Sequence, residues 1–168
     1  LYGLYPSEAV SREKFKLKPA MSLKSNIISL RRLEPGTLVG YGGEYQTKRE
    51  SIIATIPIGY ADGYLRGLGN KARVLIHGSF APVVGRICMD QCMIDVTDLL
   101  IDKAITCQIG DEVVLFGTQE GNCIPVEELA DILGTINYEL VCLIGKRIPR
   151  VYKKDGKIKK VLNYLLPK

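Results

Sequence analysis

Three glycine-bracketed segments carry the side chains with the clearest potential for chemistry. Tyr41 lies between glycines in LVGYGGEY, residues 38–45. Tyr60 follows in IGYADG, residues 58–63, and a third such segment is GRICMDQC, residues 85–92. Because glycine permits tight backbone turns, a bulky side chain between glycines can reach into a cleft. We expect these three loops to line one site, with Tyr41 as its proton-transfer residue.

The usual catalytic patterns are mostly missing from the chain. It has one histidine, His77, and no GxSxG, P-loop or GxGxxG motif. A Ser-His-Asp triad would depend on His77, which falls in an expected hairpin turn. Cys88 and Cys92 are four residues apart, but a zinc site would lack a convincing fourth ligand, so no metal is predicted. These thiols are expected to be buried and apolar.

A tyrosine that moves protons needs help from its surroundings. A free phenol titrates at about pH 10, so cations or hydrogen bonds must lower its pKa before it acts as a base. Arg66 and Arg86 lie in the same set of loops and would supply positive potential. Spacing alone leaves two interpretations open for Tyr41, Tyr60 and Tyr138. Each is either a reactive group or, more commonly, a packed aromatic with a backbone partner for its hydroxyl.

Composition indicates a globular chain that works in a reducing compartment. The 168 residues are 46% hydrophobic, enough for one domain with a core. Basic residues exceed acidic ones by 23 to 18, but the lysines of residues 153–160 flank an Asp-Gly turn, which favours a solvated hairpin over nucleic-acid binding. Neither a membrane span nor a signal peptide is expected. Five cysteines without a CxxC pair favour the cytoplasm over a disulfide framework.

Many short apolar runs between turn residues predict a mostly β fold, a small barrel or sandwich with one or two short helices. Pro35-Gly36 and Asp155-Gly156 mark turns, and Pro125 and Gly134 bracket a helix. Asn137 is expected to cap a second helix. A strand exit at 1–6 and a linker at 7–18 are followed by expected strands at 20–33, 37–41, 51–58, 72–76, 81–84, 92–97, 112–116, 150–153 and 157–165, and by helices at 126–133 and 137–144.

The loop motifs together resemble alanine racemase, a fold-type III enzyme that uses pyridoxal 5′-phosphate (PLP). The resemblance rests on two ten-residue blocks, ATIPIGYADG at 54–63 and VGRICMDQCM at 84–93. The YGGEY, INYE and RIPR segments support it, at 41–45, 136–139 and 147–150. It covers the whole chain but only the C-terminal part of the family protein.

The resemblance implies a role for each matching residue. Tyr41 matches the tyrosine that removes the α-proton of one alanine enantiomer and returns it to the other face. Met89 matches the residue whose backbone N–H holds the substrate carboxylate, and Tyr138 matches the tyrosine that hydrogen-bonds the PLP phosphate. The residues that match the narrow substrate entryway are Tyr60, Arg66, Arg86 and Ile136.

The resemblance also implies chemistry shared between two subunits. PLP delocalises the carbanion left when the Cα–H bond breaks, and racemisation needs a base on each face. In the family one base is the PLP-bearing lysine, and the tyrosine comes from the second subunit of a head-to-tail homodimer. The product, D-alanine, serves peptidoglycan synthesis in the cell wall.

The family's N-terminal (β/α)8 barrel and its PLP lysine are not in this sequence. We therefore expect residues 1–18 to be the remnant of the last barrel strand with a linker, and residues 19–168 to be the C-terminal β domain. By itself this polypeptide is expected to be inactive. Three alternatives stay open: a serine or serine/alanine racemase, a PLP decarboxylase of related architecture, and a β module used only for dimerisation.

Overall fold

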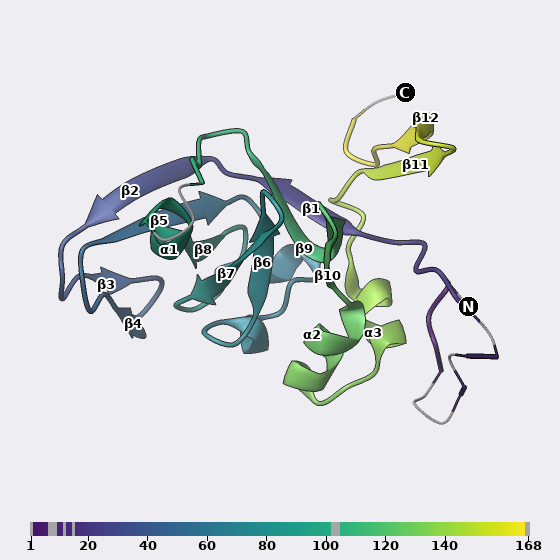
Figure 1. Ribbon diagram of the computed structural model, residues 1–168, viewed down its shortest axis with the longest axis horizontal. Coiled ribbons are helices and arrows are strands. Elements are labelled where there is room, and N and C mark those ends of the chain that lie inside the picture. Colours follow the sequence, from purple (N-terminus) through teal and green to yellow (C-terminus); the bar gives the residue numbers. More distant parts are fainter. Residues whose placement is uncertain (1, 7–9, 12, 15, 102–104, 167–168) are drawn as a thin grey trace.

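A curled antiparallel sheet forms the body of the protein (Figure 1). The computed structural model describes residues 2–6, 10–11, 13–14, 16–101 and 105–166. Strands follow the order β1-β9-β6-β7-β8-β5-β2. Strand β10 pairs with residues 117–119 of β9, beyond the part that pairs with β1. Their bounds are β1 Leu23–Asn26, β2 Ser29–Leu33, β5 Ser51–Ile56, β6 Arg73–Ile76, β7 Ser79–Val84, β8 Cys92–Asp95, β9 Glu112–Gln119 and β10 Asn122–Ile124. The expected mostly β, barrel-like fold is confirmed.

The central strands β6 and β9 are buried on both faces. Val74, Leu75 and Ile76 of β6 have no exposed surface, and the same holds for residues 113–115 of β9. Continuous burial replaces the alternation of a half-exposed strand because other elements cover both faces of the sheet here. The main core is therefore centred on these two strands.

Helix α2 (Val126–Leu133) has the bounds that its flanking residues predicted. Pro125 is its N-cap, and Gly134 ends it in the left-handed conformation with φ 69°. Glu127 and Glu128 lie in the first turn, where their negative charges interact favourably with the positive end of the helix dipole. Its buried face packs into the main core beside α3 (Asn137–Leu143).

Two small hairpins project from the sheet. One joins β3 (Leu38–Val39) to β4 (Tyr45–Gln46), and it lies at the end of the sheet opposite α2 and α3 (Figure 1). The other joins β11 (Arg150–Lys154) to β12 (Lys157–Leu162) through Asp155-Gly156, as expected, and both turn residues have positive φ. This second hairpin stands apart from the sheet near the C-terminus (Figure 1).

Several expected boundaries are wrong for identifiable reasons. The 92–97 strand stops at Asp95, whose carboxylate accepts the Thr97 amide at 3.0 Å just before an unexpected third helix, α1 (Thr97–Ile101). The expected 112–116 strand continues past Gly117, and β9 ends at Gln119. The φ of Gly117 is 121°, and a Cβ there would lie 2.4 Å from Ser22 Oγ, so the glycine permits close packing inside the strand.

The expectations for residues 1–6 and for Asn137 also need correction. The expected strand exit at 1–6 includes a turn at residues 2–3, where Gly3 has φ 74° and the Tyr2 carbonyl accepts the Ala20 amide. Asn137 does not cap α3, since Ile136 holds the N-cap position. The Asn137 amide instead donates to the Tyr5 carbonyl at 3.0 Å and to Glu127 at 2.8 Å. Part of the expected 7–18 linker lies outside the described residues.

Other elements differ from their expected bounds by a few residues. Residues 20–33 divide into β1 and β2, and residues 60–70 contain two short 3-10 helices, η1 (Tyr60–Asp62) and η2 (Arg66–Leu68). Expected strands at 37–41, 51–58 and 157–165 end sooner, at Val39, Ile56 and Leu162. In the described ranges, no helix has both the length and the apolar surface that crossing a membrane requires.

Candidate functional site

Tyr41 stands at the tip of the β3–β4 hairpin. Gly40, Gly42 and Gly43 around it all have φ between 63° and 82°, a left-handed conformation that strains other residues. The Gly43 amide donates to the Gly40 carbonyl and closes the turn. The side chain of Tyr41 is 73% exposed. A packed core aromatic is therefore excluded, and the phenol faces away from the protein body.

Arg86 reaches the Tyr41 loop from the neighbouring segment. Its guanidinium forms an ion pair with Glu44 and lies beside Gly42, where a Cβ would be 3.5 Å from Nη1. The hydrogen bond from Arg86 lowers the pKa of Glu44, and the bond to Glu44 raises the pKa of Arg86. The expected positive potential at Tyr41 is thus partly offset by Glu44, which sequence reasoning missed although it lies within the YGGEY motif.

The loops of Tyr60 and Met89 are joined through their backbones. The Tyr60 amide donates to the Cys88 carbonyl at 3.1 Å, and the Ala61 amide donates to the Met89 carbonyl at 3.0 Å. Met89 is 52% exposed and Tyr60 is 37% exposed. The structure therefore brings the three glycine-bracketed loops side by side, with Arg86 linking the first loop to the third.

Gly59 is required where these loops cross. Its φ is −151°, so its conformation suits any residue, but a Cβ would lie 2.2 Å from the Cys88 carbonyl oxygen and 2.5 Å from that of Met89. Backbone atoms at that distance cannot rotate out of the way.

We expect Gly59→Ala to lower the free energy of unfolding by about 1–3 kcal/mol, because the loops must separate to admit the methyl group. Urea denaturation of the chain measures this. Gly145→Ala is the matched control, since its Cβ would have no contact closer than 3.5 Å. Equal stabilities of the two variants would contradict the close approach.

Asp62 anchors the Tyr60 loop from inside. It is 3% exposed, and its Oδ2 accepts the Gly59 amide at 3.0 Å. Its Oδ1 faces Arg147, which also contacts Asp90 beside Met89. Sequence reasoning missed Asp62, Asp90 and Arg147 as interacting residues, although all three lie in the motif segments that carried the family resemblance.

Tyr138 and Ile136 belong to a different part of the molecule. The Tyr138 hydroxyl, half-buried on α3, donates to the Leu4 carbonyl at 3.2 Å. Ile136 precedes the helix and is exposed. These two residues therefore lie with the N-terminal segment, whereas Tyr41, Arg86, Tyr60 and Met89 share the linked loops.

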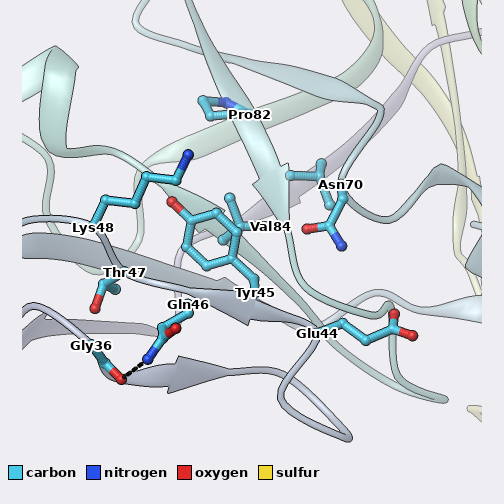
Figure 2. A pocket seen from close by; sticks show the side chains of 10 residues that line it. Gly36, Glu44, Tyr45, Gln46, Thr47, Lys48, Asn70, Pro82 and Val84 are labelled. Carbon is cyan, nitrogen blue, oxygen red and sulfur yellow. Dashed lines mark hydrogen bonds between the residues drawn. The ribbon is translucent and has the colours of Figure 1, made fainter.

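A hollow of about 900 Å³ lies beside the Tyr41 hairpin but does not contain Tyr41 (Figure 2). Lys48 and the Tyr45 ring point into it from the hairpin, opposite Asn70 and Pro82 (Figure 2). The Tyr45 hydroxyl donates to Asp95 at 3.1 Å. None of the sequence-predicted site residues lines this hollow.

The linked loops present a phenol at Tyr41, a cation at Arg86 and an exposed backbone segment at Met89. A proton-transfer reaction needs a second surface against Tyr41 and Met89 to exclude water. Among the described residues, no three His, Cys, Asp or Glu side chains gather where they would hold a metal ion. All five cysteines are free thiols.

Comparison with known proteins identifies the family to which this chain belongs. Residues 20–152 match the family model described as alanine racemase, C-terminal domain. The chain is 52% identical over 165 residues to alanine racemase 1 of Clostridium acetobutylicum, covering 98% of this chain and 42% of that protein. It is 53% identical over 152 residues to alanine racemase of Desulfovibrio desulfuricans, covering 90% and 38%.

Solved structures agree with this assignment. The crystal structure of alanine racemase from Bacillus anthracis with bound L-Ala-P matches with a TM-score of 0.89 at 40% identity, over 98% of this chain and 41% of that one. The Clostridium difficile alanine racemase complex with cycloserine matches with a TM-score of 0.88 at 47% identity, over 98% and 42%. The chain thus spans about two fifths of the length of its relatives, and it belongs to the alanine racemase C-terminal domain family.

Proposed function

We propose that this chain supplies one half of an alanine racemase active site, with Tyr41 as the proton-transfer group. The supporting observation is the position of Tyr41. Tyr41 stands at a glycine turn, is exposed in this chain, and lies in the same loop set as the Arg86–Glu44 ion pair. A base must reach its proton directly, and this phenol is free to do so.

Met89 and the entryway residues support a small amino acid as the substrate. The Met89 amide lies on the loop that is bonded to the Tyr60 segment, and a backbone N–H there suits a carboxylate. We assign Tyr60, Arg66 and Arg86 to a narrow entry that favours a small amino acid such as L- or D-alanine. Ile136 lies on a different part of this chain and would join the entry only where two subunits meet. The B. anthracis relative, solved with bound L-Ala-P, supports this substrate class.

The proposed cofactor is PLP, which withdraws electrons from Cα so that its proton can be removed. In this proposal Tyr138 contacts its phosphate. The one hydroxyl proton of Tyr138 is donated to the Leu4 carbonyl at 3.2 Å, so that bond would give way to the phosphate. Residues of this chain do not fit attachment, because every lysine that the structure describes is exposed. The attachment lysine would therefore come from a barrel outside this chain.

Because Tyr41 is exposed in this chain, it is suited to act on a substrate that is bound by a second subunit. Tyr41 and Met89 would complete the site of a second subunit in a head-to-tail homodimer, which would exclude water from the reaction. In this proposal residues 1–18 end the preceding barrel and residues 19–168 form the β domain. The free thiols fit a reducing compartment, the cytoplasm.

A fusion tests the function directly. The chain replaces the matching 165 residues of C. acetobutylicum alanine racemase 1, so that the relative provides its own barrel. We expect the fusion to bind PLP and to interconvert L- and D-alanine. A folded fusion that binds PLP but does not racemise alanine would overturn the proposal.

The same fusion separates the remaining candidates for substrate. L-serine is assayed beside L-alanine, and kcat/KM is compared for the two. A higher value for serine would favour the serine or serine/alanine racemase alternative, whereas a folded fusion inactive on both would favour a dimerisation module.

A further inference from the structure

Arg147 joins two loops of the proposed site from a third segment. Its Nε lies 3.3 Å from Asp62 Oδ1, and its Nη2 lies 2.6 Å from Asp90 Oδ1. Asp62 belongs to the Tyr60 loop, and Asp90 follows Met89 directly. One guanidinium therefore contacts both loops through separate nitrogen atoms of its planar fork, whereas a lysine ammonium would have to reach both carboxylates from a single nitrogen.

The segment that carries Arg147 is itself fixed against the Tyr60 loop. The Gly145 amide donates to the Asp62 carbonyl at 3.0 Å, and the Ile148 amide donates back to the Gly145 carbonyl at 3.3 Å. A Cβ on Gly63 would lie 2.4 Å from the Leu143 carbonyl oxygen, so the two backbones are in close contact. Backbone contacts thus hold the segment of Arg147 against the Tyr60 loop in addition to the two ion pairs.

Burial distinguishes these contacts from an ordinary surface ion pair. The Asp62 side chain is only 4% exposed, while those of Arg147 and Asp90 are 46% and 57% exposed. Exposed pairs contribute little, but removing the partner of a buried carboxylate leaves a charge without compensation. The hydrogen bond to Asp90, followed by the charge of Asp62, raises the pKa of Arg147, which keeps the guanidinium charged.

We propose that Arg147 is a positioning residue that holds the Tyr60 and Met89 loops in register through Asp62 and Asp90. It touches neither substrate nor cofactor in this proposal. Its effect is to fix the Met89 backbone N–H relative to the Tyr60 side chain, so that a small carboxylate meets both at once. This role rests on the proposed function, because it assigns Arg147 to the geometry of that site.

The first experiment measures the loops in the 168-residue chain, without cofactor or substrate. Hydrogen exchange followed by NMR reports the Tyr60 and Ala61 amides, which donate to Cys88 and Met89. We expect Arg147→Gln to speed their exchange by about tenfold or more, since the loops separate more often without the guanidinium. Arg147→Lys should recover only part of the protection.

Arg32→Gln is the matched control for this measurement. Arg32 forms an exposed ion pair with Glu50 at 2.6 Å on β2, away from the three loops. It should leave exchange at Tyr60 and Ala61 unchanged. If Arg147→Gln does not fold, Asp90→Asn removes only the exposed half of the contact and is measured in its place. Wild-type exchange rates in these variants would overturn the proposal.

The second experiment measures kinetics in the fusion to the C. acetobutylicum barrel. We expect Arg147→Gln to raise KM for alanine by about 10- to 100-fold with a smaller change in kcat, because a misplaced Met89 N–H weakens carboxylate binding. General destabilisation would instead reduce the amount of active enzyme and leave KM unchanged. Faster exchange with an unchanged KM would overturn the positioning role.

The two experiments separate this inference from the proposed function. A wild-type fusion that folds, binds PLP and does not racemise alanine removes the proposed function and the kinetic role with it. The exchange result then decides alone whether Arg147 holds the loops together.

Discussion

Tyr41→Phe in the fusion should lower kcat for alanine racemisation by about 10²- to 10⁴-fold in both directions, the range that a positioned acid–base group contributes. The substitution removes only the hydroxyl of an exposed ring, so neither the fold nor PLP binding should change. Initial rates with L-alanine and with D-alanine, together with the absorbance of bound PLP, measure the two effects separately.

Solvent isotope exchange sharpens this test. In D₂O, the Tyr41→Phe fusion should still exchange the α-proton of one enantiomer, because the base on the opposite face belongs to the barrel. Exchange of the other enantiomer should be lost. Tyr152→Phe is the control, since Tyr152 is a similarly exposed tyrosine on β11 and should retain full activity. Racemisation by Tyr41→Phe at near the wild-type rate would remove Tyr41 from the mechanism.

The chain alone should show no racemase activity and no specific binding of PLP. The lysines that the structure describes are all exposed, so none is desolvated in the way that activates a lysine for Schiff-base chemistry. Tyr41 and Met89 also stand on an open surface to which water has access.

Titration of the chain with PLP, followed by borohydride reduction and mass spectrometry, measures attachment. We expect scattered labelling of surface lysines and no D-alanine from L-alanine. Labelling of a single lysine together with turnover would show that the chain holds a complete site, contrary to the proposal.

Local signals in the sequence predicted the elements whose ends are set by neighbouring residues. Pro125 and Gly134 set the ends of α2, and Asp155-Gly156 set the last hairpin. Helix α1 was missed because the residues that lead into it also continue an alternating strand pattern. The continuation of β9 past Gly117 was missed because a glycine is needed there for close contact with Ser22, almost a hundred residues earlier.

The candidate site divides in the same way. The motifs were sufficient to name Tyr41, Tyr60 and Met89 as neighbours, and the structure brings their loops together. The Arg147 contacts depend on how the segment after α3 packs against η1, which no local pattern specifies. The exposure of Tyr41 likewise follows from the position of its hairpin at the end of the sheet.

The pairing of β1 with β9 sets an order for folding during synthesis. Leu23 lies opposite Phe116 and Asn26 lies opposite Glu112, so β1 must wait for almost ninety further residues to leave the ribosome. Strands β5, β6, β7 and β8 can pair earlier, since their partners are closer along the chain. Until β9 emerges, β1 lacks this strand partner, and its unpaired backbone groups are open to pairing with another chain.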